Sequence, residues 1–193
     1  RLPKTIIAAE VEAIRKSGVE IKTGVRVGKD VTLDRLKAEG FKAIFLATGA
    51  WKSMRLNVPG EESKGVLQSL PYLKAVNLGE PVKVGPRVIV VGGGNSAIDA
   101  ARAAVRDPDV KSVTILYRRT RAEMPAFPEE VEAAIEEGID LKLLAAPVKV
   151  LSKNGKVVGA ECLKMKLGEK DAGGRRKPVP VEGSEFKIEA ETV

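Results

Sequence analysis

Apolar residues recur at helical spacing near the start of the chain, and shorter alternating or continuous apolar runs follow. Ile7, Val11 and Ile14 are three or four positions apart, which is typical of one apolar face of a helix. The pattern therefore predicts an α/β fragment. In chain order it comprises a helix over 2–17 with Gly18 as its left-handed cap, a short strand over 18–23, a helix from Thr32 to Gly40 and an apolar strand over 41–49.

Hydrophobic periodicity is lost after Ala50, where prolines and glycines up to Gly65 are typical of a long connection. Such a connection is a reasonable domain boundary. We therefore expect one unit over residues 1–50 and another over residues 51–193, the second of which opens on a helix over 67–77.

The clearest pattern lies in the middle of the chain, where an apolar run stops at three glycines and an alanine-rich helical segment follows. The strands and helices alternate there, which implies a parallel sheet with right-handed crossovers. The predicted elements are a strand over 87–92, a helix over 95–106, a strand over 111–119 and a helix over 128–137 that ends at Gly138.

An antiparallel appendage is expected after this unit. Asn154 and Gly155 join two alternating segments, which is a strong signal of a tight hairpin. Residues 168–180 are expected to form a polar loop. Residues 185–193 begin a further strand that no turn or capping residue closes, so we expect the chain to be a piece of a longer protein.

Composition and charge narrow the chemistry. The 193 residues carry 33 basic and 26 acidic side chains, a formal charge of +7 that favours anionic partners. Histidine is absent, and the single cysteine, Cys162, is expected to be a half-buried core residue. We therefore expect no metal site and no catalytic side chain, and a reducing, cytoplasmic setting. No apolar run approaches the roughly 20 residues that span a bilayer, so no membrane partner is expected.

A glycine motif is the strongest chemical signal. Gly92, Gly94 and Ala97 follow a predicted strand and open a predicted helix, which is the context of the GxGxxG/A dinucleotide fingerprint. Gly92 is expected to permit the tight turn and Gly94 to let a pyrophosphate approach the backbone, while the small Ala97 lets helix and strand pack closely. The helix amino terminus would attract the anion. A glycine turn that serves packing alone is the other interpretation.

The end of the next strand indicates which dinucleotide is bound. An NAD site would place an acidic residue there for the ribose 2′-hydroxyl, whereas this strand ends in Arg118 and Arg119, with Arg121 two positions on. Adjacent guanidinium groups suit a 2′-phosphate, so NADPH is the expected nucleotide. The alternative is a solvated basic face, and for Arg121 the two interpretations are equally open.

Four stretches together resemble the small subunit of NADPH-dependent glutamate synthase and its relatives, which include adrenodoxin reductase and the flavin portion of dihydropyrimidine dehydrogenase. The resemblance covers essentially the whole chain, in order. The stretches are "IFLATGA" at 44–50, "VPGEESKGVLQSLPYL" at 58–73, "GGGNSAIDAAR" at 92–102 and "YRRTRAEMPAFPEEVEAAIEEGI" at 117–139.

The resemblance implies an α/β fold of the FAD/NAD(P)-linked reductase type, with a Rossmann-like parallel sheet and an antiparallel β appendage. It implies that NADPH passes hydride to FAD and that electrons leave through iron-sulfur clusters. In such proteins the ATG segment closes the FAD domain, and Glu123 lies near the nicotinamide half. The implied cofactor-binding residues, with those of the motif, are Gly92, Gly93, Gly94, Asn95, Ser96, Ala97, Asp99, Arg118, Arg119, Glu123, Ala47, Thr48 and Gly49.

The same resemblance implies parts that this chain lacks. The first glycine-rich motif for FAD, the closing FAD segment and the cluster cysteines would all lie outside Arg1 to Val193. We therefore expect a strip of the FAD domain, residues 1–50, attached to an NADPH-binding domain, and a chain that is colourless by itself. Its expected partners are NADPH, the rest of the FAD domain, and a large glutamate synthase subunit or another electron acceptor.

Other interpretations remain. A non-catalytic dinucleotide-sensing Rossmann domain would need neither the ATG segment nor the hairpin appendage. A nucleic-acid binder has only the net charge in its favour and lacks an interleaved aromatic stripe, so no nucleic-acid partner is expected. Trp51 could stack on an adenine but more often such a residue packs at an interface. The "GGRRKP" loop at 173–178 could touch an acidic partner, although exposed charge runs are usually solvated.

Overall fold

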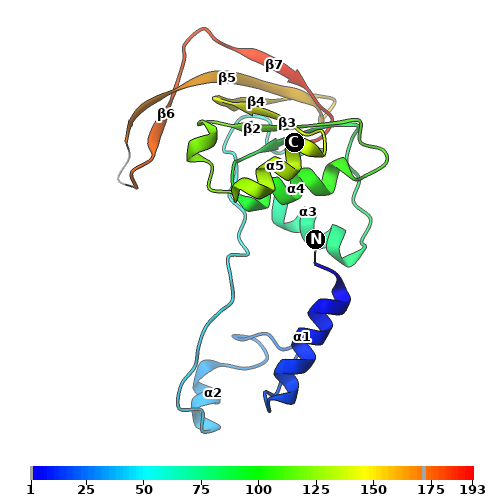
Figure 1. Cartoon of the computed structure of the whole chain (residues 1–193), viewed down its shortest axis with the longest axis vertical. Coiled ribbons are helices and arrows are strands. Elements are labelled where there is room, and N and C mark those ends of the chain that lie inside the picture. The colour runs from blue at the N-terminus through cyan, green and yellow to red at the C-terminus, as the bar shows by residue number, and fades with distance from the viewer. Residues whose placement is uncertain (1, 171–172) are drawn as a thin grey trace. The chain divides into compact units, whose positions relative to one another are not determined.

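The computed structural model describes residues 2–170 and 173–193. Contacts divide the chain after Gly49 into a first unit and a second unit that begins at Ala50 (Figure 1). The assignment of the first unit to a flavin domain and of the second to an NADPH domain stays a prediction.

The first unit holds two helices, α1 (Lys4–Lys16) and α2 (Leu33–Ala38), which confirms both predicted helices. The Thr32 side chain accepts a hydrogen bond from the Arg35 N–H at 3.2 Å and so caps α2. None of the unit's described residues is buried.

The strands predicted over 18–23 and 41–49 are wrong, because neither segment is a strand in the structure. A strand needs a neighbour for its backbone hydrogen bonds, and within the described part of the first unit no segment pairs with either stretch. The apolar side chains of 41–49 are consequently open to solvent, with Phe45 92% exposed and Leu46 63% exposed.

The second unit contains a parallel sheet of three strands in the order β1-β2-β3, as the alternating pattern predicts. Its helices α4 and α5 lie on one side of this sheet, and the antiparallel strands lie on the other (Figure 1). In chain order the elements are α3 (Ser69–Leu78), β1 (Arg87–Val91), α4 (Asn95–Val105), β2 (Ser112–Tyr117), the 3-10 helix η1 (Arg121–Glu123), α5 (Pro128–Glu136) and β3 (Asp140–Leu143).

The antiparallel sheet is built around one long strand, β5 (Lys156–Lys170). It pairs with β4 (Ala145–Lys153) through the predicted turn, where Asn154 and Gly155 have φ of 53° and 73°. It also pairs with β6 (Arg176–Pro180) and β7 (Phe186–Glu189).

The polar loop predicted over 168–180 is therefore wrong in part. β5 continues to Lys170, and β6 supplies its partner from Arg176, while residues 171 and 172 lie outside the described residues. Backbone groups make the ladder, so charged side chains on both strands do not prevent pairing.

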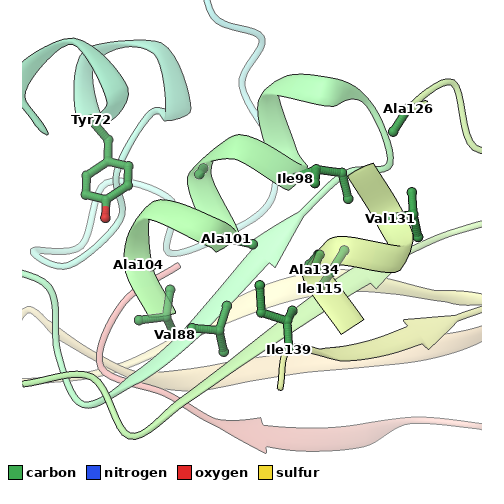
Figure 2. Close-up of a cluster of buried hydrophobic side chains, with 12 residues drawn as sticks. Tyr72, Val88, Ile98, Ala101, Ala104, Ile115, Ala126, Val131, Ala134 and Ile139 are labelled. Carbon is green, nitrogen blue, oxygen red and sulfur yellow. The ribbon is translucent and has the colours of Figure 1, made fainter. Parts of the chain in front are cut away.

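The strands β1 and β2 of the parallel sheet are covered on both faces, which explains their mostly apolar sequences, whereas the edge strand β3 exposes Asp140 and Lys142. Along β1, Val88 joins the cluster under the helices and Ile89 joins the cluster against the antiparallel sheet. On β2 the same division separates Ile115 from Leu116. Figure 2 shows the helix-side cluster, where Ile98 of α4 lies among side chains from α5 and the strands. Cys162 belongs to the other cluster and is fully buried.

The last residues of the chain return to β1 and close the second unit. Thr192 pairs in parallel with Val88, on the edge of β1 away from β2, and the Ile89 N–H donates to the Thr192 carbonyl at 2.9 Å. Arg87 forms ion pairs with Glu189 and Glu191, and Val193 exchanges backbone hydrogen bonds with the loop at 65–67.

An ion-pair cluster joins α4 to the end of α5. The Arg102 guanidinium donates to Glu137 at 2.6 and 3.0 Å and to Glu130 at 2.5 Å, and Arg106 donates to Glu137 at 2.6 Å. The Arg102 side chain is only 15% exposed. Hydrogen bonding from Arg102 lowers the pKa of Glu137.

Arg102→Met should therefore lower the free energy of unfolding at pH 7 by about 1 to 3 kcal/mol, because it removes charge-assisted bonds from a half-buried carboxylate. Urea unfolding measures the loss. The matched Arg106→Met change should cost less, because that side chain is 52% exposed.

A carboxyl with a lowered pKa stabilises the fold fully above its ordinary pKa, and that contribution is lost as the pH falls through the lowered pKa. The difference in the free energy of unfolding between wild type and Arg102→Met should therefore shrink at acid pH. A difference that stays the same there would contradict the stabilising role of the hydrogen bonds from Arg102 to Glu137.

Candidate functional site

The candidate site begins at the turn between β1 and α4. Gly92 follows β1 with a φ of 141°, and its N–H donates to the Leu116 carbonyl at 3.0 Å. A Cβ at Gly92 would lie 3.2 Å from the Cβ of Ala97. Both residues therefore have to be small for the turn and the helix to pack this closely, which is the geometry that the motif predicts.

Gly93 is small for a different reason. A Cβ there would lie 2.5 Å from the Tyr117 ring, and that ring is held because its hydroxyl donates to the Glu123 carbonyl at 2.6 Å. The Gly93 carbonyl also accepts the Ala126 N–H at 3.1 Å. Gly93 thus has a packing role, and contact with a cofactor stays a prediction.

Gly94 is the N-cap of α4, and a side chain there would meet no close contact. Its φ is −93°, and the nearest atom to a Cβ there would be Pro125 Cγ at 3.8 Å. Its carbonyl accepts the N–H groups of Ala97 and Ile98. In the part of the chain that the structure describes, the N–H groups of Asn95 and Ser96 donate to no protein acceptor. Two donors without a protein acceptor thus follow Gly94 at a helix amino terminus, an arrangement that suits a phosphate.

The other predicted residues of α4 lie in its first two turns. The Asn95 Oδ1 accepts the Phe127 N–H at 3.0 Å and so holds the segment that leads into α5. Ser96 is exposed, and Asp99 is half-buried one turn further on. The structure therefore brings all three to the same helix terminus.

The two arginines at the end of β2 differ in their exposure to solvent. Arg118 is exposed, as a phosphate contact would need. Arg119 is buried at 5% exposure, and its Nε donates to the Arg176 carbonyl at 2.6 Å. Arg121 forms an ion pair with Glu132 at 2.5 Å. Arg118 is thus the better placed of the predicted phosphate contacts, and these contacts stay predictions.

Glu123 closes the same segment. Its carboxylate accepts hydrogen bonds from the Thr120 hydroxyl at 2.5 Å and from the Thr120 N–H at 3.1 Å, which forms a capping box around η1. The hydrogen bond from the Thr120 side chain lowers the pKa of Glu123. The carboxylate is therefore held in its charged form at the end of β2, and a position near a nicotinamide stays a prediction.

A hollow of about 350 Å³ lies beside this segment. One of its lining residues, Pro125, is also the nearest neighbour that a Cβ at Gly94 would have. Sequence reasoning did not place the basic residues of β5 and β6 here, although the "GGRRKP" run was visible as a signal. The lining residues are Ala122, Glu123, Met124, Pro125, Lys170, Gly174, Arg175 and Arg176.

The predicted ATG residues, Ala47, Thr48 and Gly49, belong to the first unit and are exposed. The glycine turn and the hollow belong to the second unit, so a cofactor role for the ATG residues stays a prediction. Trp51 is 73% exposed.

Two further functional features are absent from the described residues. No group of three or more His, Cys, Asp or Glu side chains among them could hold a metal ion. None of the helices they form is both long enough and apolar enough to cross a membrane.

Comparison with known proteins gives a family and curated relatives. The family described as pyridine nucleotide-disulphide oxidoreductase matches residues 7–172. The NADPH-Fe(3+) oxidoreductase subunit beta of Geobacter sulfurreducens is 45% identical over 100% of this chain, which covers 29% of that protein. The glutamate synthase [NADPH] small chain of Escherichia coli is 37% identical, again over 100% of this chain and 43% of that protein. The chain thus spans less than half the length of these relatives.

A solved structure shares the fold. FprA from Mycobacterium tuberculosis in complex with NADPH superposes with a TM-score of 0.72 at 20% identity, and the match covers 88% of this chain and 52% of that one. The likeness supports the α/β architecture with its separate antiparallel sheet.

Proposed function

Because the chain belongs to the pyridine nucleotide-disulphide oxidoreductase family, we propose that its second unit binds NADPH within a flavin-dependent oxidoreductase. This membership agrees with the resemblance found in the sequence. The observation that carries the proposal is that the N–H groups of Asn95 and Ser96 have no acceptor among the described residues and directly follow Gly94, where a Cβ would have its nearest neighbour at 3.8 Å. A Cβ would meet no close contact there, so the absence of a side chain at Gly94 has a purpose outside the packing of the fold.

The residues around Gly94 supply what a dinucleotide needs. The N–H groups of Asn95 and Ser96 would receive the pyrophosphate at the amino terminus of α4. Arg118, exposed at the end of β2, would meet the 2′-phosphate. Gly92, Gly93 and Ala97 hold the turn close enough to α4 for this arrangement.

The proposed reaction needs little acid–base chemistry from this chain. A bound NADPH would supply a hydride for a flavin whose ring is held face to face with the nicotinamide. The role of the protein is then to orient the nucleotide and to exclude water. A chain without histidine can perform that role.

The rest of the activity belongs to the longer protein that we infer. We propose that the first unit, with Ala47, Thr48 and Gly49, is part of an FAD domain, and that electrons leave through iron-sulfur clusters outside this chain. The curated relatives are named as subunits, which supports a partner subunit, such as a large glutamate synthase subunit or another electron acceptor. We also place the protein in the cytoplasm, where NADPH and a reduced Cys162 are expected. A non-catalytic sensing domain is not favoured, because the curated relatives are named as oxidoreductases or synthases.

Calorimetric titration tests the proposal. The chain should bind NADPH at least about tenfold more tightly than NADH, since a charge-assisted contact to the 2′-phosphate contributes about 1.5 to 3 kcal/mol. Arg118→Ala should weaken NADPH binding and leave NADH binding unchanged. Lys153→Ala, which removes one exposed charge at the β4–β5 turn, serves as the matched control.

Three results would count against it. Equal affinity of the wild type for both nucleotides removes the specificity. Equal losses in the Arg118→Ala and Lys153→Ala variants assign the effect to general charge. A wild type that binds neither nucleotide refutes the proposed function as a whole.

A further inference from the structure

The segment over residues 124–127, which joins η1 to α5, is held against the glycine turn by hydrogen bonds. The Ala126 N–H donates to the Gly93 carbonyl at 3.1 Å, and the Phe127 N–H donates to Asn95 Oδ1 at 3.0 Å. Ala126 is also buried in the cluster under the helices (Figure 2). The segment is therefore fixed to the same turn that opens α4.

The backbone of Phe127 is fixed on its other side as well. Phe127 is the N-cap of α5 with φ of −61° and ψ of 134°, and its carbonyl accepts the N–H groups of Glu130 and Val131 at 3.0 and 3.2 Å. Pro128 follows it, and a proline restricts the residue before it to extended conformations. Phe127 thus has a well-defined backbone position next to the amino terminus of α4.

The Phe127 side chain, in contrast, is 63% exposed, whereas the neighbouring Ala126 is 6% exposed. The hydrogen bond to the Asn95 side chain attaches this exposed ring beside the helix terminus where the N–H groups of Asn95 and Ser96 have no acceptor among the described residues. An aromatic ring on a fixed backbone loses little conformational freedom when a ligand contacts it. The ring is therefore suited to contact whatever binds at this terminus.

We propose that Phe127 covers the pyrophosphate of the dinucleotide at the amino terminus of α4, and that the Asn95 side chain is a positioning group that holds Phe127 there. The inference rests on the proposed function, because it assigns a further residue to the same nucleotide site. The edge of a phenyl ring is the positive part of its quadrupole and suits phosphate oxygens. An apolar cover also excludes water, which strengthens the contacts between the phosphate and the N–H donors.

The test compares two variants that each lose one exposed apolar side chain. Phe127→Ala removes the proposed cover, and Leu78→Ala removes a side chain that is 60% exposed at the last residue of α3. Each chain is titrated with NADPH, NADH and ADP-ribose, and circular dichroism confirms that it is folded. ADP-ribose has the pyrophosphate but neither the nicotinamide nor the 2′-phosphate. Phe127→Ala should bind all three ligands about five- to tenfold more weakly, by the same factor, and Leu78→Ala should bind them as the wild type does.

Salt dependence supplies a second measurement, which a loss of stability alone would not change. Water that enters in place of the Phe127 ring would let ions screen the pyrophosphate from its donors. The affinity of Phe127→Ala for ADP-ribose should therefore fall more steeply with NaCl concentration than that of the wild type. Equal salt dependence in the two chains would overturn the covering role.

The outcomes separate this inference from the proposed function. Three results would overturn the role of Phe127 and leave the proposed function intact: wild-type affinities in Phe127→Ala, a loss for NADPH and NADH that ADP-ribose does not share, or an equal loss in Leu78→Ala. A wild type that binds neither NADPH nor NADH contradicts the proposed function itself, and the role of Phe127 falls with it.

The positioning role of Asn95 is tested by non-additivity. Asn95→Ala removes the acceptor of the Phe127 N–H and keeps the backbone donors of α4, so it should weaken ADP-ribose binding by no more than Phe127→Ala does. Combined with Phe127→Ala it should cause no further loss, since both changes remove the same cover. An added loss in the combined variant would make the Asn95 side chain a direct ligand contact and would overturn its positioning role.

Discussion

Gly94→Val should abolish binding of NADPH and NADH while leaving the second unit folded. Valine tolerates the φ of −93° at this position, and the nearest atom to its Cβ would be 3.8 Å away. The branched side chain would instead occupy the space next to the donors of Asn95 and Ser96, where the pyrophosphate is expected. We expect a loss of affinity of roughly 100-fold or more, equal for the two nucleotides, because both carry the pyrophosphate.

Calorimetry measures this loss, and the circular dichroism spectrum and melting temperature establish that the fold is kept. Gly94→Ala forms a graded control, since its single methyl group fills less of the space and should weaken binding less. Wild-type affinity in a folded Gly94→Val chain would mean that the glycines serve packing alone.

Gly93→Ala should instead lower the free energy of unfolding of the chain. The added Cβ would lie 2.5 Å from the Tyr117 ring, which is 6% exposed and tied through its hydroxyl to the Glu123 carbonyl. The ring cannot move aside without breaking that bond, so we expect a loss of about 1 to 3 kcal/mol in the free energy of unfolding.

A double-mutant cycle with Tyr117→Leu attributes the loss to this contact. Tyr117→Leu makes room for the new methyl group, so Gly93→Ala should cost much less in that background than in the wild type. Urea unfolding of the four chains supplies the comparison. An unchanged midpoint for Gly93→Ala, or an equal cost in both backgrounds, would show that Tyr117 is not what requires a glycine there.

The sequence was most informative where local pattern and tertiary surroundings agree. β1 and β2 are mostly apolar because both of their faces are covered, and α4 begins directly after the glycines. These features depend on neighbours that are close along the chain. The Asn154-Gly155 turn is similar, because positive φ at two successive residues is a local requirement that few residues other than Asn and Gly meet.

The failures concern features that depend on pairing and burial, which the composition of a segment does not show. The apolar run at 41–49 has strand composition, but no described segment of its unit pairs with it. β6 is polar enough to be taken for a loop, yet β5 supplies its ladder. The sequence cannot distinguish Arg118 from Arg119, since the burial of Arg119 depends on a carbonyl 57 positions away.

The pairing of Thr192 with β1 also means that β1 is synthesised well before its partner on this edge. Arg87 and Glu191 are 104 positions apart, so a ribosome that adds roughly 5 to 20 residues per second needs about 5 to 20 s between them. Throughout that interval β1 is made but the edge that Thr192 covers has no partner. An unpaired edge on an apolar strand is a template for pairing with other chains. The nascent protein is therefore exposed to misassembly at this edge until residues 190–193 have emerged.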